Sequence, residues 1–292
     1  MTPERPRKPT GSRTPNRFTQ RRDQPRRDQP RREGPPRGGD RSLGGTSWEK
    51  SADWYDRIIG ERGSELYREV VIPRALDLLQ PQRGERILDI GCGQGVFSRA
   101  ISDGSSALVT GIDASRTLIQ KARTYQGRTP IRYFDRDAAD LGGLGDFDAA
   151  SAILCLQNLE HLDKVCSAAV AVLKPGGRML WVLNHPAFRI PRQSSWGFEE
   201  ERKIQYRRVD AYSSTLSIPI VMHPGKADSE STVSVHRSLD SLMAPGFAAG
   251  LTLAGLQEWH SHKESQPGPR ARAENRARKE FPLFLALLWR RP

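Results

Sequence analysis

The sequence predicts an α/β fold built on a doubly wound, mostly parallel sheet. Apolar runs of strand length alternate with amphipathic helical segments between residues 85 and 184, and such alternation is typical of parallel sheets covered by helices. Glycines at 91, 93 and 95 follow the first apolar run directly, where a strand would turn into a helix. The first 46 residues are polar and basic, and they differ in composition from everything that follows.

Residues 1–46 are expected to form a disordered basic tail. They hold 13 Lys or Arg, 5 Asp or Glu and three apolar side chains, Met1, Phe18 and Leu43, so burial cannot offset the entropy of ordering them. A five-residue near-repeat over 21–35 (RRDQP, RRDQP, RREGP) carries prolines that block a continuous helix. The tail is interpreted as solubilising, with a weak contact to RNA or to an anionic surface as the alternative.

Without the tail, the net charge of +12 falls to +4 on residues 47–292, an ordinary value for a soluble domain. The strongly apolar run 281–289 contains Pro282 and is too short to span a bilayer. No apolar segment of the kind found in secretory signals follows the basic N-terminus. Three cysteines without a CxxC pair indicate reduced thiols. We therefore expect a cytoplasmic protein with one enzyme-sized domain over 47–292 and no membrane contact.

The elements are expected in the following order. Residues 49–80 form one or two helices, which Pro73 either breaks or restarts. Strands lie at 85–91, 107–113, 131–137, 147–155 and 178–184, with helices at 96–102, 115–125 and 162–173 and a turn at 174–177. Residues 185–237 lack clear periodicity and form an insertion before a helix at 239–249. Strands at 251–259 and 281–289 suit an antiparallel edge pair. The side chains expected to pack inside include Cys155, Cys166, Trp196, Trp259 and Trp289.

The strongest chemical signal is LDIGCGQG at 88–95, followed by Asp113 at the end of the second expected strand. A backbone without Cβ atoms can approach a ligand closely, and a carboxylate can accept two hydrogen bonds from a ribose diol. The dinucleotide fingerprint GxGxxG is incomplete, because position 96 is valine, which disfavours a nicotinamide oxidoreductase. The structural alternative is a tight turn with Asp113 as a helix N-cap.

These motifs resemble those of class I S-adenosylmethionine-dependent methyltransferases, and most closely the small-molecule group called methyltransferase type 11. LDIGCGQG, GIDAS at 111–115 and LKPGG at 173–177 leading into RMLWVLN carry the resemblance. It implies a Rossmann-like, seven-stranded, mostly parallel sheet with an antiparallel last strand, and S-adenosyl-L-methionine bound across the first strand ends. It also implies the cofactor-binding residues: Asp89 near the methionine amino end, Gly91, Cys92, Gly93 and Gly95 along the amino-acid moiety, Asp113 at the ribose with Ala114 beside it, Asp137 and Ala138 flanking the adenine, and Leu156 and Gln157 under the sulfonium.

Methyl transfer from a sulfonium requires positioning and only sometimes a base. His185, directly after the strand expected at 178–184, is the candidate general base, and a structural histidine hydrogen-bonded within its loop is the alternative. No motif for a metal site is present. Later polar residues are mostly expected to be solvated, although a few could bind an acceptor carboxylate or phosphate; they are Arg189, Arg192, Tyr206, Arg207, Arg208, His223, His236, Arg237, His260, His262 and Lys263.

The function expected from these residues is methyl transfer from S-adenosylmethionine to a small-molecule acceptor. Two alternatives stay open at this point. The acceptor could be RNA, with the basic tail as a tether, or the domain could be a non-catalytic module that keeps the cofactor fold and binds a partner protein.

Overall fold

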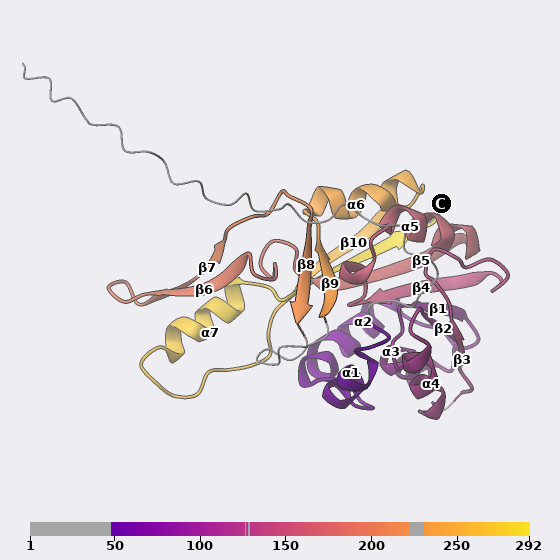
Figure 1. The fold of residues 1–292 in the computed structure, drawn as a ribbon, viewed down its shortest axis with the longest axis horizontal. Coiled ribbons are helices and arrows are strands. Elements are labelled where there is room, and N and C mark those ends of the chain that lie inside the picture. Colours follow the sequence, from indigo (N-terminus) through magenta and orange to yellow (C-terminus); the bar gives the residue numbers. More distant parts are fainter. Residues whose placement is uncertain (1–47, 126, 128, 222–230) are drawn as a thin grey trace, which may run out of the picture. The chain divides into compact units, whose positions relative to one another are not determined.

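Seven strands form the central sheet in the order β10–β11–β5–β4–β1–β2–β3 (Figure 1). The computed structural model describes residues 48–125, 127, 129–221 and 231–292. β1 pairs in parallel with β2 on one side and with β4 on the other, and β3 and β5 continue the parallel part. β11 is antiparallel to both of its neighbours, β5 and β10. The mostly parallel sheet with a reversed last strand is therefore confirmed; its strands are β1 (Arg86–Ile90), β2 (Leu108–Asp113), β3 (Arg132–Asp135), β4 (Phe147–Ile153), β5 (Leu173–Asn184), β10 (Thr252–Trp259) and β11 (Phe284–Arg290).

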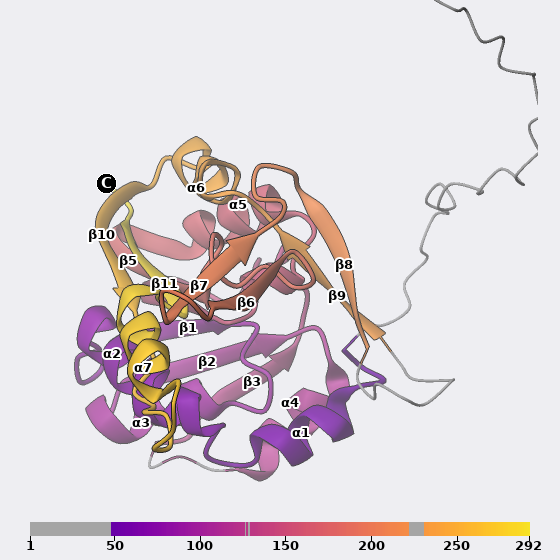
Figure 2. The same cartoon turned by 90° about the vertical axis from the view of Figure 1, so that its left-hand side faces the viewer.

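Helices cover both faces of this sheet, as a doubly wound fold requires. Successive residues of β1 face opposite layers: Ile87 belongs to the apolar cluster with α2 and α3, whereas Leu88 and Ile90 belong to the cluster with α5 and α6. Figure 2 shows α1 to α4 on one side of the sheet and α5 and α6 on the other. The helices are α1 (Ala52–Ile59), the π-helix η1 (Tyr67–Val71), α2 (Ile72–Leu79), α3 (Val96–Ser105), α4 (Arg116–Thr124), the 3₁₀ turn η2 (Leu156–Asn158), α5 (Leu162–Val172), α6 (Leu239–Ala248) and α7 (Ala271–Glu280).

The helical segment before the sheet turns at Gly60 and Gly63, which have φ of 64° and 84°. Pro73 neither breaks nor starts a helix, because residues 65–79 form one continuous helical segment in which η1 leads directly into α2. The π-helix lies directly before this proline, which has no N–H to donate. The break between the helices therefore comes from the glycines rather than from the proline.

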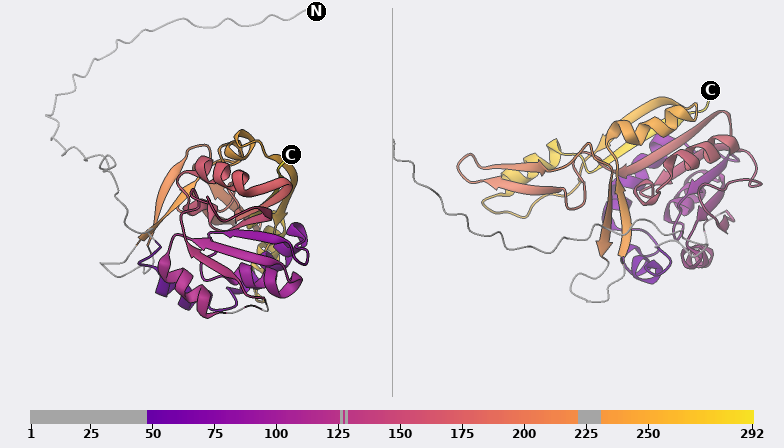
Figure 3. Two further views of the ribbon diagram at one scale, coloured as in Figure 1. Left: turned by 90° about the vertical axis from the view of Figure 1, so that its right-hand side faces the viewer. Right: turned by 45° about the horizontal axis from the view of Figure 1, so that its top comes forward.

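Residues 185–237, for which no regular elements were predicted, contain two antiparallel strand pairs. β6 (Ser194–Glu199) pairs with β7 (Ile204–Val209), and β8 (Leu216–Val221) pairs with β9 (Ser231–His236). Figure 3 shows β6, β7 and α7 extending beyond the sheet. Because this pair has no fully covered face, Trp196 is 43% exposed, and the prediction that it packs inside is wrong. Trp259 and Trp289 are buried as predicted, and so are Cys155 and Cys166.

The turn predicted at 174–177 is part of β5 rather than a separate connection. Phe147 of β4 pairs with Leu173, and the next paired position, Ala149, faces Arg178. The intervening residues bulge out of the ladder, with Gly176 at a φ of 75°. The LKPGG sequence therefore marks a bulge inside a long strand.

Residues 1–46, predicted as a disordered tail, lie outside the described residues. Among the residues that are described, no helix combines the length and the apolar character that a membrane crossing needs.

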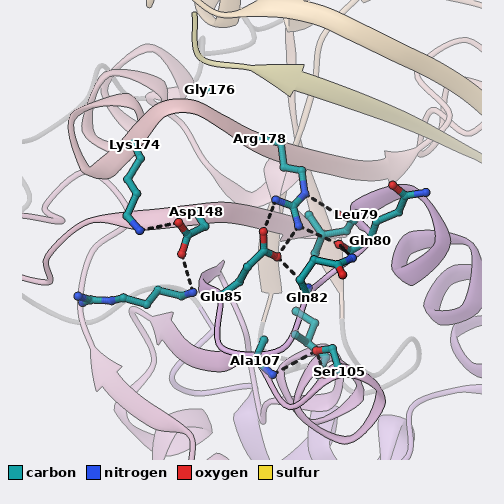
Figure 4. A network of polar contacts seen from close by, with 12 residues as sticks. Leu79, Gln80, Gln82, Glu85, Ser105, Ala107, Asp148, Lys174, Gly176 and Arg178 are labelled. Atoms are coloured by element: carbon teal, nitrogen blue, oxygen red, sulfur yellow. Dashed lines mark hydrogen bonds and ion pairs between the residues drawn. The ribbon is translucent and has the colours of Figure 1, made fainter.

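A polar network ties the amino ends of β1, β4 and β5 to the end of α2 (Figure 4). Arg178 donates two hydrogen bonds to the Glu85 carboxylate, at 2.9 and 2.6 Å, and two more to the backbone carbonyls of Leu79 and Gln80. Burial raises the pKa of Glu85, but the hydrogen bonds from Arg178 outweigh it, so the pKa is lowered overall. One guanidinium thus satisfies terminal carbonyls of α2 and fixes the helix against the sheet.

Glu85→Gln is expected to lower the free energy of unfolding at pH 7 by about 1–3 kcal/mol, because it leaves the Arg178 guanidinium without its anion. A carboxylate with a lowered pKa stabilises the fold above its unfolded pKa of about 4.3, and that contribution is lost as the pH falls further. The variant should therefore lose less stability than the wild type between pH 5 and pH 3, measured by chemical denaturation. Glu69→Gln, at an exposed helix position, is the control. Parallel stability–pH curves for wild type and Glu85→Gln would contradict the assigned role.

Candidate active site

The predicted cofactor residues come together where β1, β2 and β4 end. In the sheet, Ile90 of β1 lies beside Ile112 of β2 and Ala152 of β4. The chain continues from these strand ends into the glycine loop over 91–95, Asp113 and the turn over 154–157. Because carboxyl ends of parallel strands meet at one edge of a sheet, residues far apart in sequence share one site.

The glycine loop joins β1 to α3, and Gly91, Gly93 and Gly95 all have positive φ, between 54° and 80°. A Cβ at Gly91 would lie 2.6 Å from Cβ of Cys155, and one at Gly95 would lie 2.3 Å from the hydroxyl oxygen of Tyr133. These two positions need glycine for packing inside the protein. At Gly93 the nearest atom to such a Cβ is Cε1 of Tyr55, at 3.7 Å, so the Tyr55 ring covers the middle of the loop.

Asp113 connects this loop to the start of α4. Its Oδ2 accepts a hydrogen bond from the Gly93 N–H at 3.0 Å, and its Oδ1 accepts one from the Ser115 N–H at 2.8 Å. Burial raises the pKa of the Asp113 carboxyl, and the two N–H donors offset part of that shift. The N-cap of α4 is Ser115, whose Oγ accepts from the Leu118 N–H. The alternative in which Asp113 caps the helix is therefore wrong, and each carboxylate oxygen keeps a lone pair for a ligand.

Asp89 lies beneath the glycine loop, 1% exposed. Its carboxylate accepts hydrogen bonds from Ser98 Oγ of α3 at 2.6 Å and from Ser151 Oγ of β4 at 2.9 Å. Burial raises the pKa of Asp89 to about 6, and the nearby charge of Asp113 adds to the rise. Asp89 thus joins β1, α3 and β4, and its predicted place near the methionine amino end stays a prediction.

The other predicted cofactor residues surround the same edge. Cys92 is half-buried, and its N–H donates to the Ile112 carbonyl at 2.9 Å, which holds the loop on β2. Ala114 and Asp137 are exposed, and Ala138 is buried. Leu156 is fully buried and Gln157 is half-buried. They follow Cys155 and Leu154, and Leu154 has a φ of 55°. This left-handed residue turns the chain sharply where β4 ends.

Aromatic residues of the N-terminal helices lie above this edge, and they were not predicted from the sequence as site residues. Tyr55 of α1 lies over Gly93, and its pKa is raised by burial and by the Asp113 carboxylate. Burial also raises the pKa of Tyr67, and Tyr55 and Asp89 add to that rise. Both tyrosines lie in the segment 49–80, for which the sequence predicts helices and no site residue. No pattern in the sequence distinguishes such a residue from one that faces a site.

Residues 49–61 lie over the glycine loop and are called the N-terminal cover below. Polar contacts hold this cover in place. Glu49 accepts hydrogen bonds from Ser115 Oγ at 2.7 Å and from Thr117 Oγ1 at 2.6 Å, so it caps the start of α4 from a distant part of the chain. Lys121 of α4 forms ion pairs with Asp53 and Asp56 of α1, each at 3.1 Å. The cover is therefore attached to the same helix that begins beside Asp113.

A small cavity of about 40 Å³ lies next to this edge, between the ends of β4 and β5 and strand β9. We call it the β4–β5 cavity; its lining includes Leu156, Gln157, Asn184, Arg189, His236 and Arg237. Arg237 closes one side by donating to the backbone carbonyls of Leu159 and Glu160, both at 2.7 Å. Arg189, His236 and Arg237 were named from sequence only within a larger group of polar residues.

His185, the candidate base, lies outside the lining of this cavity, although its neighbours Asn184 and Pro186 belong to it. Its Nδ1 accepts a hydrogen bond from the Ala187 N–H at 3.2 Å, and its Nε2 lies 2.7 Å from Glu258 Oε1. Burial lowers the pKa of His185, against the effect of Glu258. Both ring nitrogens are engaged, so this arrangement favours the alternative of a structural histidine.

The residues at the β1–β2 edge fit S-adenosylmethionine, which carries a sulfonium and an ammonium group. Burial raises the pKa of both Asp89 and Asp113, and a nearby carboxylate adds to each rise, Asp113 for Asp89 and Glu49 for Asp113; a bound cation would relieve that repulsion. Asp113 has acceptor capacity left for a ribose diol, and Tyr55 lies over the backbone at Gly93. When bound, this cofactor supplies a methyl group activated for displacement.

Comparisons with known proteins agree with this geometry. Residues 88–181 match the family model of a methyltransferase domain. An O-methyltransferase of Penicillium expansum is 37% identical over 137 residues, which cover 44% of this chain and 47% of that protein. A ubiquinone biosynthesis O-methyltransferase of Thiobacillus denitrificans is 34% identical over 116 residues, or 37% of this chain and 47% of that protein. The chain spans about half the length of the curated relatives it matches.

Solved structures show the same fold. An S-adenosylmethionine-dependent methyltransferase from Mesorhizobium loti aligns with a TM-score of 0.61 at 23% identity, covering 80% of this chain and 100% of that one. A putative S-adenosylmethionine-dependent methyltransferase from Listeria monocytogenes aligns with a TM-score of 0.55 at 18% identity, covering 75% and 97%. The family model and the fold agree: residues 88–181 match a methyltransferase domain, and the chain has the fold of S-adenosylmethionine-dependent methyltransferases.

Proposed function

We propose that this chain transfers the methyl group of S-adenosylmethionine to a small-molecule acceptor. One observation carries the proposal: the glycine loop and Asp113 lie at the same sheet edge as a small cavity whose lining includes Leu156 and Gln157. Cys155, directly before these two residues, packs on Gly91 of the glycine loop. A cofactor on the loop and an acceptor in the cavity would therefore be neighbours, which is what in-line transfer requires. The O-methyltransferase names of two relatives support a small acceptor.

Within this proposal, Asp113 holds the ribose, and the glycine loop lies along the amino-acid moiety. Asp137 and Ala138, which follow β3, flank the adenine, and Leu156 and Gln157 lie under the sulfonium. These placements rest on the family resemblance and are supported by the position of each residue at the carboxyl edge of the sheet.

The N-terminal cover has the role of excluding water from the transfer site. Tyr55 lies above Gly93, and Gln94 and Arg99 of the loop and α3 donate to the backbone carbonyls of Gly60 and Glu61, just after α1. A covered site strengthens electrostatic interactions with a cationic cofactor and protects it from hydrolysis. The cover thus links cofactor binding to the ordering of residues 49–61.

Asp113→Ala in the full chain is expected to weaken S-adenosylmethionine binding at least tenfold, about 1.4 kcal/mol, because the ribose loses its charged acceptor. Isothermal titration calorimetry measures the affinity, and circular dichroism shows whether the variant is folded. Asp113→Asn, which keeps one acceptor oxygen, serves if the alanine variant unfolds. Asp146→Ala, at an exposed position before β4, should bind like the wild type. Equal affinities for all four proteins would remove the ribose role.

Cofactor affinity is also expected to rise as the pH increases from 5 to 7. The pKa of Asp89 is raised to about 6, so this carboxyl is largely protonated at pH 5 and ionised at pH 7. A cationic ligand binds the ionised form better and lowers its pKa, so binding near pH 6 should release a proton. Calorimetry in buffers of different ionisation enthalpy measures that proton. Asp89→Asn should reduce the pH dependence, and a wild-type affinity that is constant over this range would contradict the assignment.

The acceptor class is tested by incubating the full chain with methyl-labelled S-adenosylmethionine and a fractionated cell lysate. Label should enter the fraction of small molecules, withstand ribonuclease, and disappear with Asp113→Ala. Removal of residues 1–46 tests the alternative of a tethered RNA acceptor, whose labelling would fall with this deletion and with rising salt. Label found in RNA would overturn the small-molecule proposal, and cofactor binding without label in any fraction would favour a non-catalytic module.

A further inference from the structure

The β4–β5 cavity is lined by three polar side chains, each of which has at least one donor or acceptor atom without a partner among the residues the structure describes. Gln157 follows β4, Arg189 follows β5 and His236 ends β9, so three separate segments supply them. Buried or half-buried polar groups of this kind are normally paired. Their chemistry therefore indicates what the cavity would bind.

His236 is 6% exposed, and its hydrogen bond decides which ring nitrogen carries a proton. Nε2 lies 2.7 Å from the backbone carbonyl oxygen of Tyr212. A carbonyl oxygen can only accept, so Nε2 donates, and in the neutral ring Nδ1 then holds a lone pair. No described residue donates a hydrogen bond to Nδ1. His185 differs in this respect, because its Nδ1 already accepts from Ala187.

Tyr212 fixes this orientation from two sides. Its backbone carbonyl accepts from His236, and its hydroxyl oxygen accepts from the Leu239 N–H at the start of α6, at 3.0 Å. The imidazole is thereby held at the cavity with Nδ1 available. A lone pair fixed in this way is what a general base needs before a substrate arrives.

Arg189 supplies a cation without an anion. Its guanidinium is half-buried and lies 5.3 Å from the ring centre of Phe284, and within the described chain it makes neither an ion pair nor a hydrogen bond. Burial and the charge of Arg207 both lower the pKa of Arg189. Arg207 itself donates to the Phe188 carbonyl and to Ser194 Oγ. A partly desolvated guanidinium with free donors is suited to bidentate pairing with a carboxylate or phosphate.

Gln157 adds an unfilled acceptor. Its Nε2 donates to the Leu154 carbonyl at 2.6 Å, whereas its Oε1 is buried and has no partner among the described residues. The cavity therefore combines the Arg189 guanidinium, which has neither an ion pair nor a hydrogen bond within the described chain, with two groups that accept hydrogen bonds. A ligand that matches all three carries an anion and at least one hydrogen-bond donor.

We propose that an anionic hydroxyl compound places its polar groups in the β4–β5 cavity, whose volume of about 40 Å³ holds those groups and not the rest of the ligand. Its carboxylate or phosphate pairs with Arg189, and its hydroxyl donates its proton to Nδ1 of His236. The inference rests on the proposed methyl transfer and names the acceptor class for that site. In the step, a lone pair of the hydroxyl oxygen forms the bond to the methyl carbon of the sulfonium donor. The methyl–sulfur bond breaks with its electron pair staying on sulfur, and the hydroxyl proton moves to His236, which becomes an imidazolium.

The preference for an anionic ligand is tested by calorimetry on the full chain loaded with S-adenosylhomocysteine, which permits binding without turnover. The probes are the three hydroxybenzoate isomers, the corresponding hydroxybenzyl alcohols and the hydroxyphenyl phosphates. At least one anionic probe should bind ten times more tightly than the matching alcohol, and Arg189→Gln should abolish that preference. Arg192→Gln, an exposed neighbour outside the cavity lining, should keep it. Tighter binding of the phosphates than of the benzoates would assign the anion as a phosphate ester. A preference that is absent in the wild type or survives in Arg189→Gln overturns the inference.

The role of His236 as general base is tested by measuring kcat with S-adenosylmethionine and the probe that binds best. His236→Gln is chosen because the amide nitrogen of glutamine can still donate to the Tyr212 carbonyl while the ring lone pair is lost. It should lower kcat by a factor of about 10²–10⁴ and change probe affinity less than threefold, whereas His161→Gln, exposed at the start of α5, should leave kcat unchanged. An unchanged kcat in His236→Gln overturns the assignment, as does a loss of probe affinity equal to the loss of rate. If the wild-type chain fails to bind S-adenosylmethionine, the proposed function fails instead.

Discussion

The site depends on the position of β1 in the middle of the parallel sheet. Because β2 and β4 flank β1 and run in the same direction, the glycine loop, Asp113 and the turn before Gln157 end at one edge. Two contacts keep these ends together. The Asp89 carboxylate binds hydroxyls from α3 and β4, and Cys155 fills the space that a side chain at position 91 would need. The buried carboxylate of Asp89 and the absence of a Cβ at Gly91 thus hold the strand ends in the positions that the site needs.

The two sides of the site are built in different ways. The cofactor side consists of strand ends and backbone N–H groups, whose positions follow from sheet pairing and are shared by every protein with this strand order. The β4–β5 cavity is closed by residues from the segment between β5 and α6, which adds Arg189, His236 and Arg237 to the sheet edge. In the proposed function, acceptor choice therefore depends on a part of the chain that the sheet does not constrain. This division explains how one fold serves many acceptors.

The sequence predicts the cofactor side of the site better than it predicts the segment between β5 and α6. Continuous apolar runs ending in glycines predict buried parallel strands, because both faces of such strands are covered, and β1, β2, β4 and β5 were found where expected. The strands between residues 194 and 236 were missed, because a two-stranded ribbon that leaves Trp196 and Tyr206 exposed has no alternating pattern of burial. Glu49 was missed for a related reason. It caps α4 from 68 residues away, and local capping patterns contain no signal for such a contact.

The two histidines near the end of β5 show where sequence reasoning about catalysis stops. A histidine after a strand end is a reasonable candidate base, but its suitability depends on which groups its nitrogens face. At His185 an N–H donor and a carboxylate occupy both nitrogens. At His236 a single carbonyl occupies Nε2 and thereby leaves the lone pair on Nδ1. The carbonyl belongs to Tyr212, 24 residues earlier in the chain, so only the folded arrangement assigns the proton. From the sequence, His185 was the candidate base and His236 only one of a larger group of polar residues; the hydrogen-bond partners in the fold separate the two.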